Sequence, residues 1–167
     1  MLGIISIFWL VLAGLQEQGP TRNPEYAARL NSIYRHSVPT ITVNELKEAM
    51  KDGAVVLDAR EADEFEVSHI RHSRHVGYIW FDMRNVYDIP KTDIIVVYCA
   101  IGNRSERIGE KLKKAGYQHV FNLFGGLYEW VNRRNPVYNN EDIQTTEIHG
   151  YDKNLKTDRQ YTKKLHD

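Results

Sequence analysis

The residue in this chain best suited to covalent chemistry is its one cysteine, Cys99, which follows the apolar run 94–98 and precedes a helix-like segment near Arg104. A thiol just before a helix faces unpaired backbone N–H groups and the positive end of the helix dipole, and both favour the thiolate. Gly102 allows a tight turn whose N–H groups can point inward as an anion-binding nest. Arg104 adds a fixed positive charge. The pattern indicates a reactive cysteine; the alternative is a buried structural cysteine that ends a core strand.

The composition limits the partners and the cysteine chemistry. The 167 residues are enough for one domain with extensions. Basic and acidic residues both number 22, so no excess of charge indicates nucleic-acid binding. A single cysteine excludes an intramolecular disulfide and a CxxC redox cycle, so covalent chemistry at Cys99 must end on an external acceptor. We predict neither a metal ion nor a cofactor, because the chain has no cysteine pair for a structural zinc site.

Residues 1–18 contain an uncharged apolar run, 2–15, followed by polar residues. At about 1.5 Å per residue, this run is shorter than a bilayer core and suits the apolar region of a signal peptide. We therefore expect residues 1–18 to be a signal peptide, and the protein to be exported to a periplasm or secreted. An uncleaved membrane anchor and an ordinary apolar helix are the alternatives.

Strand-like and helix-like segments alternate along the middle of the chain. Residues 19–40 are expected to form a linker and a helix that starts at Pro24. The apolar runs 54–58 and 94–98 are typical of strands covered on both faces. Further strands are predicted at 41–43, 74–78 and 118–123, and helices at 44–50 (capped by Asn44), 61–67, 104–115 and 127–131.

This alternation predicts an α/β fold, a parallel β-sheet of about five strands with helices on both faces. Such sheets bind ligands at the carboxyl ends of their strands, which is where Cys99 lies. Residues 138–167 are polar, with too few apolar side chains for a core of their own. We expect them to form a polar C-terminal arm that either lies on the domain or is frayed in solvent.

Three segments, in order, resemble the signatures of the rhodanese family: 56–61 continuing through Glu64-Phe65 and His69-Ile70; 98–105, which contains the cysteine loop; and 116–137, with Gly125-Gly126 and Trp130. The resemblance covers residues 41–137 and implies a rhodanese-like domain. The chain departs from the family pattern at Ser68, where glycine is usual, and at 71–73, where Pro-Gly-Ala is usual.

The resemblance implies sulfur transfer of the thiosulfate sulfurtransferase type. Cys99 would take a sulfane sulfur from a small donor such as thiosulfate, form a persulfide, and pass the sulfur to a thiol or to cyanide. Backbone N–H groups suited to hold the persulfide anion come from the loop residues Ala100, Ile101, Gly102, Asn103, Arg104 and Ser105. Asp58 and Arg60 would be supporting residues that pair with each other and buttress this loop.

Other functions remain open at this stage. A carrier or partner-binding module could use the same residues without turnover, and an exposed low-pKa thiol could be a redox sensor. Phosphatases with a cysteinyl-phosphate intermediate place five residues between cysteine and arginine, whereas four separate Cys99 from Arg104, which argues against phosphatase chemistry. Arg104 could contact a donor anion, stabilise the persulfide or tie the loop to an acid.

Several histidines and aromatic residues have a less specific pattern. His69, His72 and His75 recur every three residues, but the segment is expected to run from turn to strand, where this spacing does not converge on a metal. The aromatic residues expected to fill the core are Trp80, Phe81, Tyr128 and Trp130, although the first two could instead cover the mouth of the site.

Overall fold

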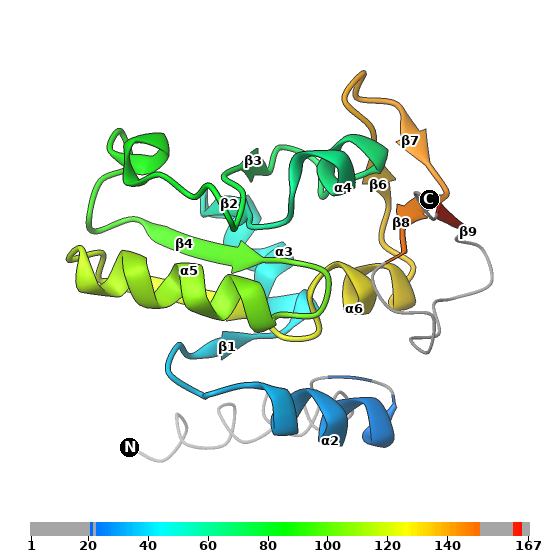
Figure 1. Ribbon diagram of the computed structural model, residues 1–167, viewed down its shortest axis with the longest axis horizontal. Coiled ribbons are helices and arrows are strands. Elements are labelled where there is room, and N and C mark those ends of the chain that lie inside the picture. Colours follow the sequence, from blue (N-terminus) through cyan, green and yellow to red (C-terminus); the bar gives the residue numbers. More distant parts are fainter. Residues whose placement is uncertain (1–20, 22, 151–161, 165–167) are drawn as a thin grey trace, which may run out of the picture.

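The computed structural model describes residue 21, residues 23–150 and the backbone of 162–164, and it confirms the predicted α/β fold. One sheet has five parallel strands in the order β1-β5-β4-β2-β3 (Figure 1). The strands are β1 (Thr40–Ile41), β2 (Val55–Asp58), β3 (Arg74–His75), β4 (Ile94–Tyr98) and β5 (His119–Leu123). β4 lies at the centre, so its carboxyl end is flanked by strands on both sides.

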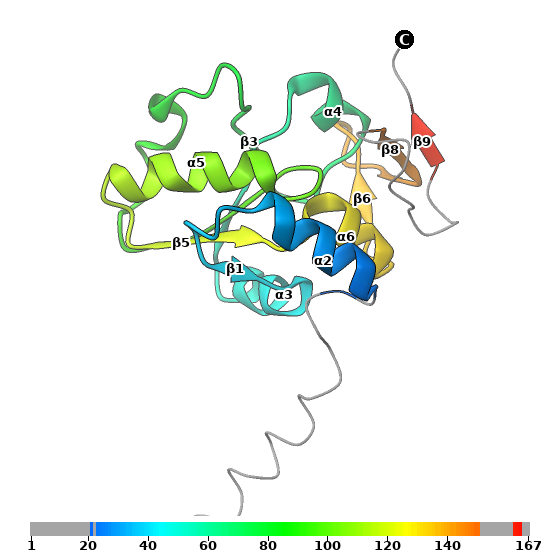
Figure 2. The ribbon, with the colours of Figure 1, turned by 60° about the horizontal axis from the view of Figure 1, so that its bottom comes forward.

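Helices cover both faces of this sheet. Figures 1 and 2 show α5 on one face and α3 and α6 on the other, with α2 beside the β1 edge. The helices are α2 (Pro24–Ile33), α3 (Val43–Lys51), α4 (Ala62–Val67), the 3₁₀ helix η1 (Met83–Val86), α5 (Asn103–Lys114) and α6 (Gly126–Asn132).

The core is divided into two clusters because alternate residues of β4 point to opposite faces. Ile95 and Val97 pack with the apolar side of α5, whereas Val96 and Tyr98 pack with α3 and α6. All four are fully buried. Burial on both faces explains the continuous apolar run of β4 and makes it a rigid support for the residue that follows it.

The start of α3 differs from the sequence prediction. Thr42, not Asn44, is the N-cap, and Asn44 lies inside the helix. The Thr42 hydroxyl accepts from the Glu45 N–H at 3.3 Å, while the Glu45 carboxylate accepts from the Thr42 N–H at 2.7 Å. This reciprocal capping box satisfies two backbone donors. A cap at Asn44, two residues later, would not satisfy them.

Trp80 is not in the core, so its predicted burial is wrong. The segment after β3 turns outward, and Trp80 is 87% exposed beside Ile79 at 68%. Phe81 is partly buried against the α5 cluster. Tyr128 and Trp130 are buried, which confirms their predicted packing role.

The chain beyond the sheet returns to the domain. β6 (Val137–Tyr138) pairs with β7 (Gln144–Thr145), and β8 (Glu147–His149) pairs with β9 (Thr162–Lys164). Ile148 is fully buried in the core cluster of α6. Residues 138–150 thus lie on the domain, which is one of the two arrangements expected of the C-terminal arm. The remainder of the arm, apart from β9, and the expected signal peptide, 1–18, lie outside the described residues. Within the described part of the chain, no helix is both long and apolar enough to cross a membrane.

Candidate active site

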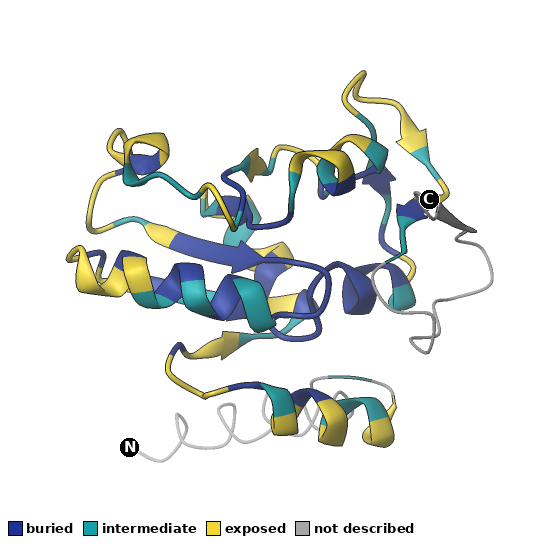
Figure 3. Cartoon of the chain, in the orientation of Figure 1, coloured by how far each residue is buried: buried dark blue, intermediate teal, exposed yellow. Residues whose placement is uncertain are grey.

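Cys99 is the first residue after β4 and begins the turn that leads into α5. Its Sγ accepts a hydrogen bond from the Gly102 N–H at 3.1 Å and lies 3.8 Å from Oδ1 of Asn103. The residue is completely buried, and Figure 3 shows β4 and the turn after it among the buried parts of the chain. The sulfur therefore occupies the predicted position before a helix, within reach of a loop N–H group.

α6 holds the first half of the cysteine loop. The Leu127 N–H donates to the Cys99 carbonyl at 2.9 Å, and the Tyr128 N–H donates to the Ala100 carbonyl at 3.1 Å. The backbones approach so closely that a Cβ on Gly126 would lie 2.3 Å from the Cys99 oxygen. Only glycine fits at this position, which gives a physical reason for the Gly125-Gly126 pair noted in the sequence.

Tyr34, which follows α2, holds the second half of the loop. Its hydroxyl donates to the Ile101 carbonyl at 2.5 Å and accepts from the Gly125 N–H at 2.9 Å. Burial raises the pKa of Tyr34 above its ordinary value, so the hydroxyl keeps the proton that it donates. Gly102 has φ of 101°, and a Cβ there would lie 2.0 Å from the Tyr34 oxygen. The predicted tight turn at Gly102 is thus packed directly against this tyrosine.

Asn122 of β5 completes the support of the loop. Its Nδ2 donates to the Gly102 carbonyl at 2.9 Å, and its Oδ1 accepts from the Ser105 hydroxyl at 2.7 Å. Ser105 is buried, so its side chain is directed at β5. Its proposed contribution to an anion site therefore comes from the backbone alone.

Arg104 is tied to an acid, which is one of the three roles considered for it. Its two terminal nitrogens donate to the two carboxylate oxygens of Glu64 in α4 at 2.6 and 2.8 Å. The side chains are only 14% and 8% exposed. Burial alone would raise the pKa of Glu64, but the hydrogen bonds and charge of Arg104 outweigh it, so the pKa lies below its ordinary value.

Asp58 and Arg60 form the buried ion pair expected of them. The guanidinium bonds the carboxylate at 3.0 and 2.6 Å, with both side chains essentially inaccessible. Burial lowers the pKa of Arg60, and the Asp58 carboxylate overcomes this effect and raises it. Arg60 also donates to the carbonyls of Glu64 and Ser68 at the end of α4, at 3.2 and 2.7 Å. It thereby positions the helix that supplies the partner of Arg104.

Comparison with known proteins agrees with this geometry. Residues 42–133, more than half of the chain, match the rhodanese-like domain. The chain belongs to the rhodanese-like domain family. The thiosulfate sulfurtransferase GlpE of Haemophilus influenzae is 29% identical over 104 residues, which are 60% of this chain and 95% of that protein. The putative sulfur carrier protein YrkF of Bacillus subtilis is 28% identical over 99 residues, and the chain spans only 53% of its length.

Solved structures share the fold of this rhodanese-like domain. A thiosulfate sulfurtransferase from Pseudomonas aeruginosa aligns with a TM-score of 0.58 at 22% identity, over 70% of this chain and 23% of that chain. The rhodanese-like domain of the Anabaena protein Alr3790 aligns with a TM-score of 0.56 at 23% identity, over 77% of this chain and 98% of that chain.

Two of the three histidines at three-residue spacing in this rhodanese-like domain, His69 and His75, have structural partners. The His69 ring stacks on Phe65, and its Nδ1 lies 3.0 Å from the Phe65 carbonyl. His75 Nε2 lies 2.8 Å from the Arg60 carbonyl. Among the residues that the structure describes, no group of three or more His, Cys, Asp or Glu side chains is arranged to hold a metal ion.

Three supporting residues of the site are not identified by the sequence reasoning. Tyr34 lies outside the signatures, and on an apolar helix face a tyrosine indicates only packing. Asn122 lies within a strand whose pattern indicates burial. A polar residue in a buried strand indicates that its side chain has hydrogen-bond partners, and this was the available signal. Glu64 belongs to the first signature, but its pairing with Arg104, 40 positions away, depends on the fold.

Removal of the Tyr34 hydroxyl should destabilise the protein. In Tyr34→Phe, the buried Ile101 carbonyl and Gly125 N–H both lose their partner. We expect the free energy of unfolding to fall by about 1–3 kcal/mol. Urea denaturation measures this loss, and Tyr87→Phe, at a residue 68% exposed, is the control that should leave stability unchanged. Equal stability of Tyr34→Phe and the native protein would contradict this role of the Tyr34 hydroxyl in holding the cysteine loop.

The Glu64–Arg104 pair should stabilise the protein in a pH-dependent way. Because the folded-state pKa of Glu64 lies below its ordinary value of 4.5, the contribution is present above that pH and is lost as the pH falls through the folded value. We expect Glu64→Gln to be destabilised by about 3 kcal/mol at neutral pH. The difference from the native protein should shrink below pH 4.5.

Glu48→Gln is the matched control for this pH series. Glu48 forms an exposed ion pair with Lys51, in which both side chains are 68% exposed. Its replacement should change the unfolding free energy by about 0.5 kcal/mol or less at every pH. A Glu64→Gln deficit that stays constant between pH 7 and pH 3 would show that the ion pair is not its source.

Proposed function

We propose that this rhodanese-like domain is a sulfurtransferase in which Cys99 carries the transferred sulfur as a persulfide. The observation that carries the proposal is the contact between Sγ and the Gly102 N–H, in a loop fixed at the carboxyl end of the central strand. The similarity to the GlpE proteins, which are named thiosulfate sulfurtransferases, supports thiosulfate or a similar small molecule as the donor.

The reaction has two displacement steps that need no external oxidant. The Cys99 thiolate attacks the outer sulfur of thiosulfate, the S–S bond of thiosulfate breaks, and sulfite leaves with the bonding electrons. The product is a Cys99 persulfide anion. A thiolate or cyanide then attacks its outer sulfur and releases Cys99 as the thiolate.

The loop is suited to the persulfide anion because of the way its carbonyl groups are directed. The carbonyls of Cys99 and Ala100 are bound by α6, and that of Ile101 is bound by Tyr34. With these oxygens held away, the Gly102 N–H is directed at the sulfur, and it donates to Sγ at 3.1 Å. Fixed N–H dipoles stabilise an anion without reorganisation during the reaction.

We assign Arg104 mainly to holding this loop. Its fork-like contact with Glu64 fixes the first turn of α5 against α4. Arg104 is five residues from Cys99 in sequence, in the first turn of α5, and its positive charge also favours the anionic sulfur. Asp58 and Arg60 act through α4 and do not contact Cys99 in this arrangement.

The mass of the intact protein tests the proposal. After incubation of the reduced protein with thiosulfate, we expect a gain of one sulfur atom that cyanide or a reductant removes. Cys99→Ser should show no gain, because the attacking thiolate is missing. Folded, reduced protein that gains no sulfur from thiosulfate would exclude this donor and contradict the persulfide mechanism as proposed.

A sulfur carrier without rapid turnover is the second candidate. The complete burial of Cys99 favours it, since a shielded persulfide is protected from water and from adventitious thiols. The B. subtilis relative is named a putative sulfur carrier. Loaded protein in excess thiosulfate and cyanide separates the two: an enzyme is reloaded by thiosulfate and forms many equivalents of thiocyanate, whereas a carrier keeps its single sulfur and releases it only slowly.

We also propose that the protein acts outside the cytoplasm, on the basis of the apolar run 2–15. Cell fractionation followed by mass measurement of the recovered protein tests export and cleavage together. Recovery of the uncleaved chain in the membrane fraction would identify residues 1–18 as an anchor. Recovery in the cytoplasm would contradict export.

A further inference from the structure

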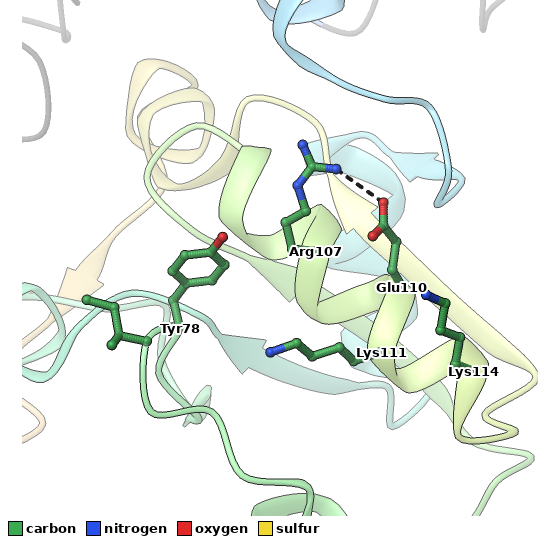
Figure 4. Close-up of a pocket in the computed structure, with 6 residues that line it drawn as sticks. Tyr78, Arg107, Glu110, Lys111 and Lys114 are labelled. Carbon is green, nitrogen blue, oxygen red and sulfur yellow. Dashed lines mark hydrogen bonds and ion pairs between the residues drawn. The ribbon is translucent and has the colours of Figure 1, made fainter.

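A pocket of about 450 Å³ lies between α5 and the segment that follows β3. Its lining residues are Tyr78, Ile79, Arg107, Glu110, Lys111 and Lys114. Figure 4 shows that the four charged residues come from α5, and that the Lys111 side chain extends toward Tyr78 on the opposite wall. We call this feature the α5 pocket; its volume is within the range of roughly 300–1,000 Å³ that ligand sites occupy.

The α5 pocket has an excess of positive charge. Arg107 is paired with Glu110 at 3.2 Å, the contact dashed in Figure 4. Lys111 and Lys114 have no carboxylate within 4.0 Å among the described residues, so the two ammonium groups are available to an anionic partner. The Lys111 ammonium lies 5.3 Å from the ring centroid of Phe81, which keeps it beside the pocket wall.

The rim of the α5 pocket is apolar. Ile79, which lines it, is 68% exposed, and the adjacent Trp80 is 87% exposed. Two consecutive exposed apolar residues, one of which lines a charged pocket, are typical of a protein-interaction surface. A small anion would use the charges but leave these two side chains in water, so the combination favours a protein partner with an acidic segment.

One wall of the α5 pocket leads back to the cysteine loop, and the other contacts the start of α4. Arg104, Arg107 and Lys111 follow one another at helical spacing along one side of α5. On the other wall, the Ile79 N–H donates to the carboxylate of Glu61 at 3.2 Å, at the start of α4. Lys111 is seven residues beyond Arg104, which is about 10 Å along the helix axis. About three extended residues span the distance from Arg104, in the first turn after the cysteine loop, to Lys111.

We propose that the α5 pocket docks a protein partner in which an acidic segment lies about three residues from a thiol, and that this thiol receives the sulfur of Cys99. The proposal rests on the proposed sulfurtransferase function. The partner thiolate attacks the outer sulfur of the Cys99 persulfide; the persulfide bond breaks, a new S–S bond forms on the partner, and Cys99 leaves as the thiolate.

Two synthetic acceptors of equal length test the proposal on the full-length protein. One is Cys-Gly-Gly followed by four glutamates, and the other carries four glutamines instead. With excess thiosulfate to reload Cys99 at low salt, we expect the acidic peptide to have a KM about five- to tenfold lower, because two lysines each contribute a modest ion pair. Salt should abolish this difference by screening the exposed charges.

Variants on two helices locate the effect. Lys111→Gln with Lys114→Gln should remove the KM advantage of the acidic peptide and leave kcat for the neutral peptide unchanged. Lys47→Gln with Lys51→Gln makes the same charge change on α3 and should keep the advantage. An advantage that is lost equally in both double variants reflects overall charge and would overturn the proposal.

A binding measurement keeps this proposal separate from the sulfurtransferase function. An acidic peptide with serine in place of its cysteine should change the fluorescence of Trp80, a change that is absent in Trp80→Phe. If thiosulfate fails to load Cys99, this binding still tests the pocket. No binding of the peptide, or binding of millimolar inorganic phosphate in its absence, would overturn docking of an acidic segment.

Discussion

The site depends on one constraint: the cysteine loop is irregular backbone in the interior of the protein, and its polar groups need partners there. An unpaired buried carbonyl costs as much as a lost hydrogen bond. Four successive carbonyls, those of residues 99–102, are bound by four different groups: two N–H groups of α6, the hydroxyl of Tyr34 and the amide of Asn122. The loop is therefore shaped by Tyr34, which precedes Ile101 of the loop by 67 residues, and by the consecutive elements β5 and α6, which follow it.

The charged residues form a second layer of support behind this loop. Asp58 fixes Arg60, Arg60 binds the carbonyls at the end of α4, and α4 presents Glu64 to Arg104. A buried ion pair adds little net stability compared with apolar side chains in its place, but removal of one partner is strongly destabilising because it leaves the other charge buried and unpaired. These contacts connect the ion pair at the end of β2 with Arg104, which follows the cysteine loop.

Much of this arrangement is predictable from the sequence. The continuous apolar runs identify β2 and β4, because strands buried on both faces need no alternation, and they place Cys99 at a carboxyl edge. Long-range hydrogen bonds are not predictable in this way. The apolar face that carries Tyr34 indicates only burial, and its partners are 67 and 91 positions away. The predicted burial of Trp80 is wrong for a related reason: the hydrophobicity of a side chain alone does not distinguish a core residue from an exposed one.

The core of this protein extends beyond the segment that matches the rhodanese-like domain, and Tyr34 is one of the residues outside that segment. The match to the rhodanese-like domain covers residues 42–133. Tyr34 precedes this segment and Ile148 follows it, yet both are buried in the same core cluster. A fragment of residues 42–133 would keep Cys99 and α5 but lose the hydrogen bond from the Tyr34 hydroxyl to the Ile101 carbonyl. In this protein the segment shared with the family is smaller than the segment that packs into one core, so the hydrogen bonds that hold the cysteine loop depend on a residue outside the shared segment.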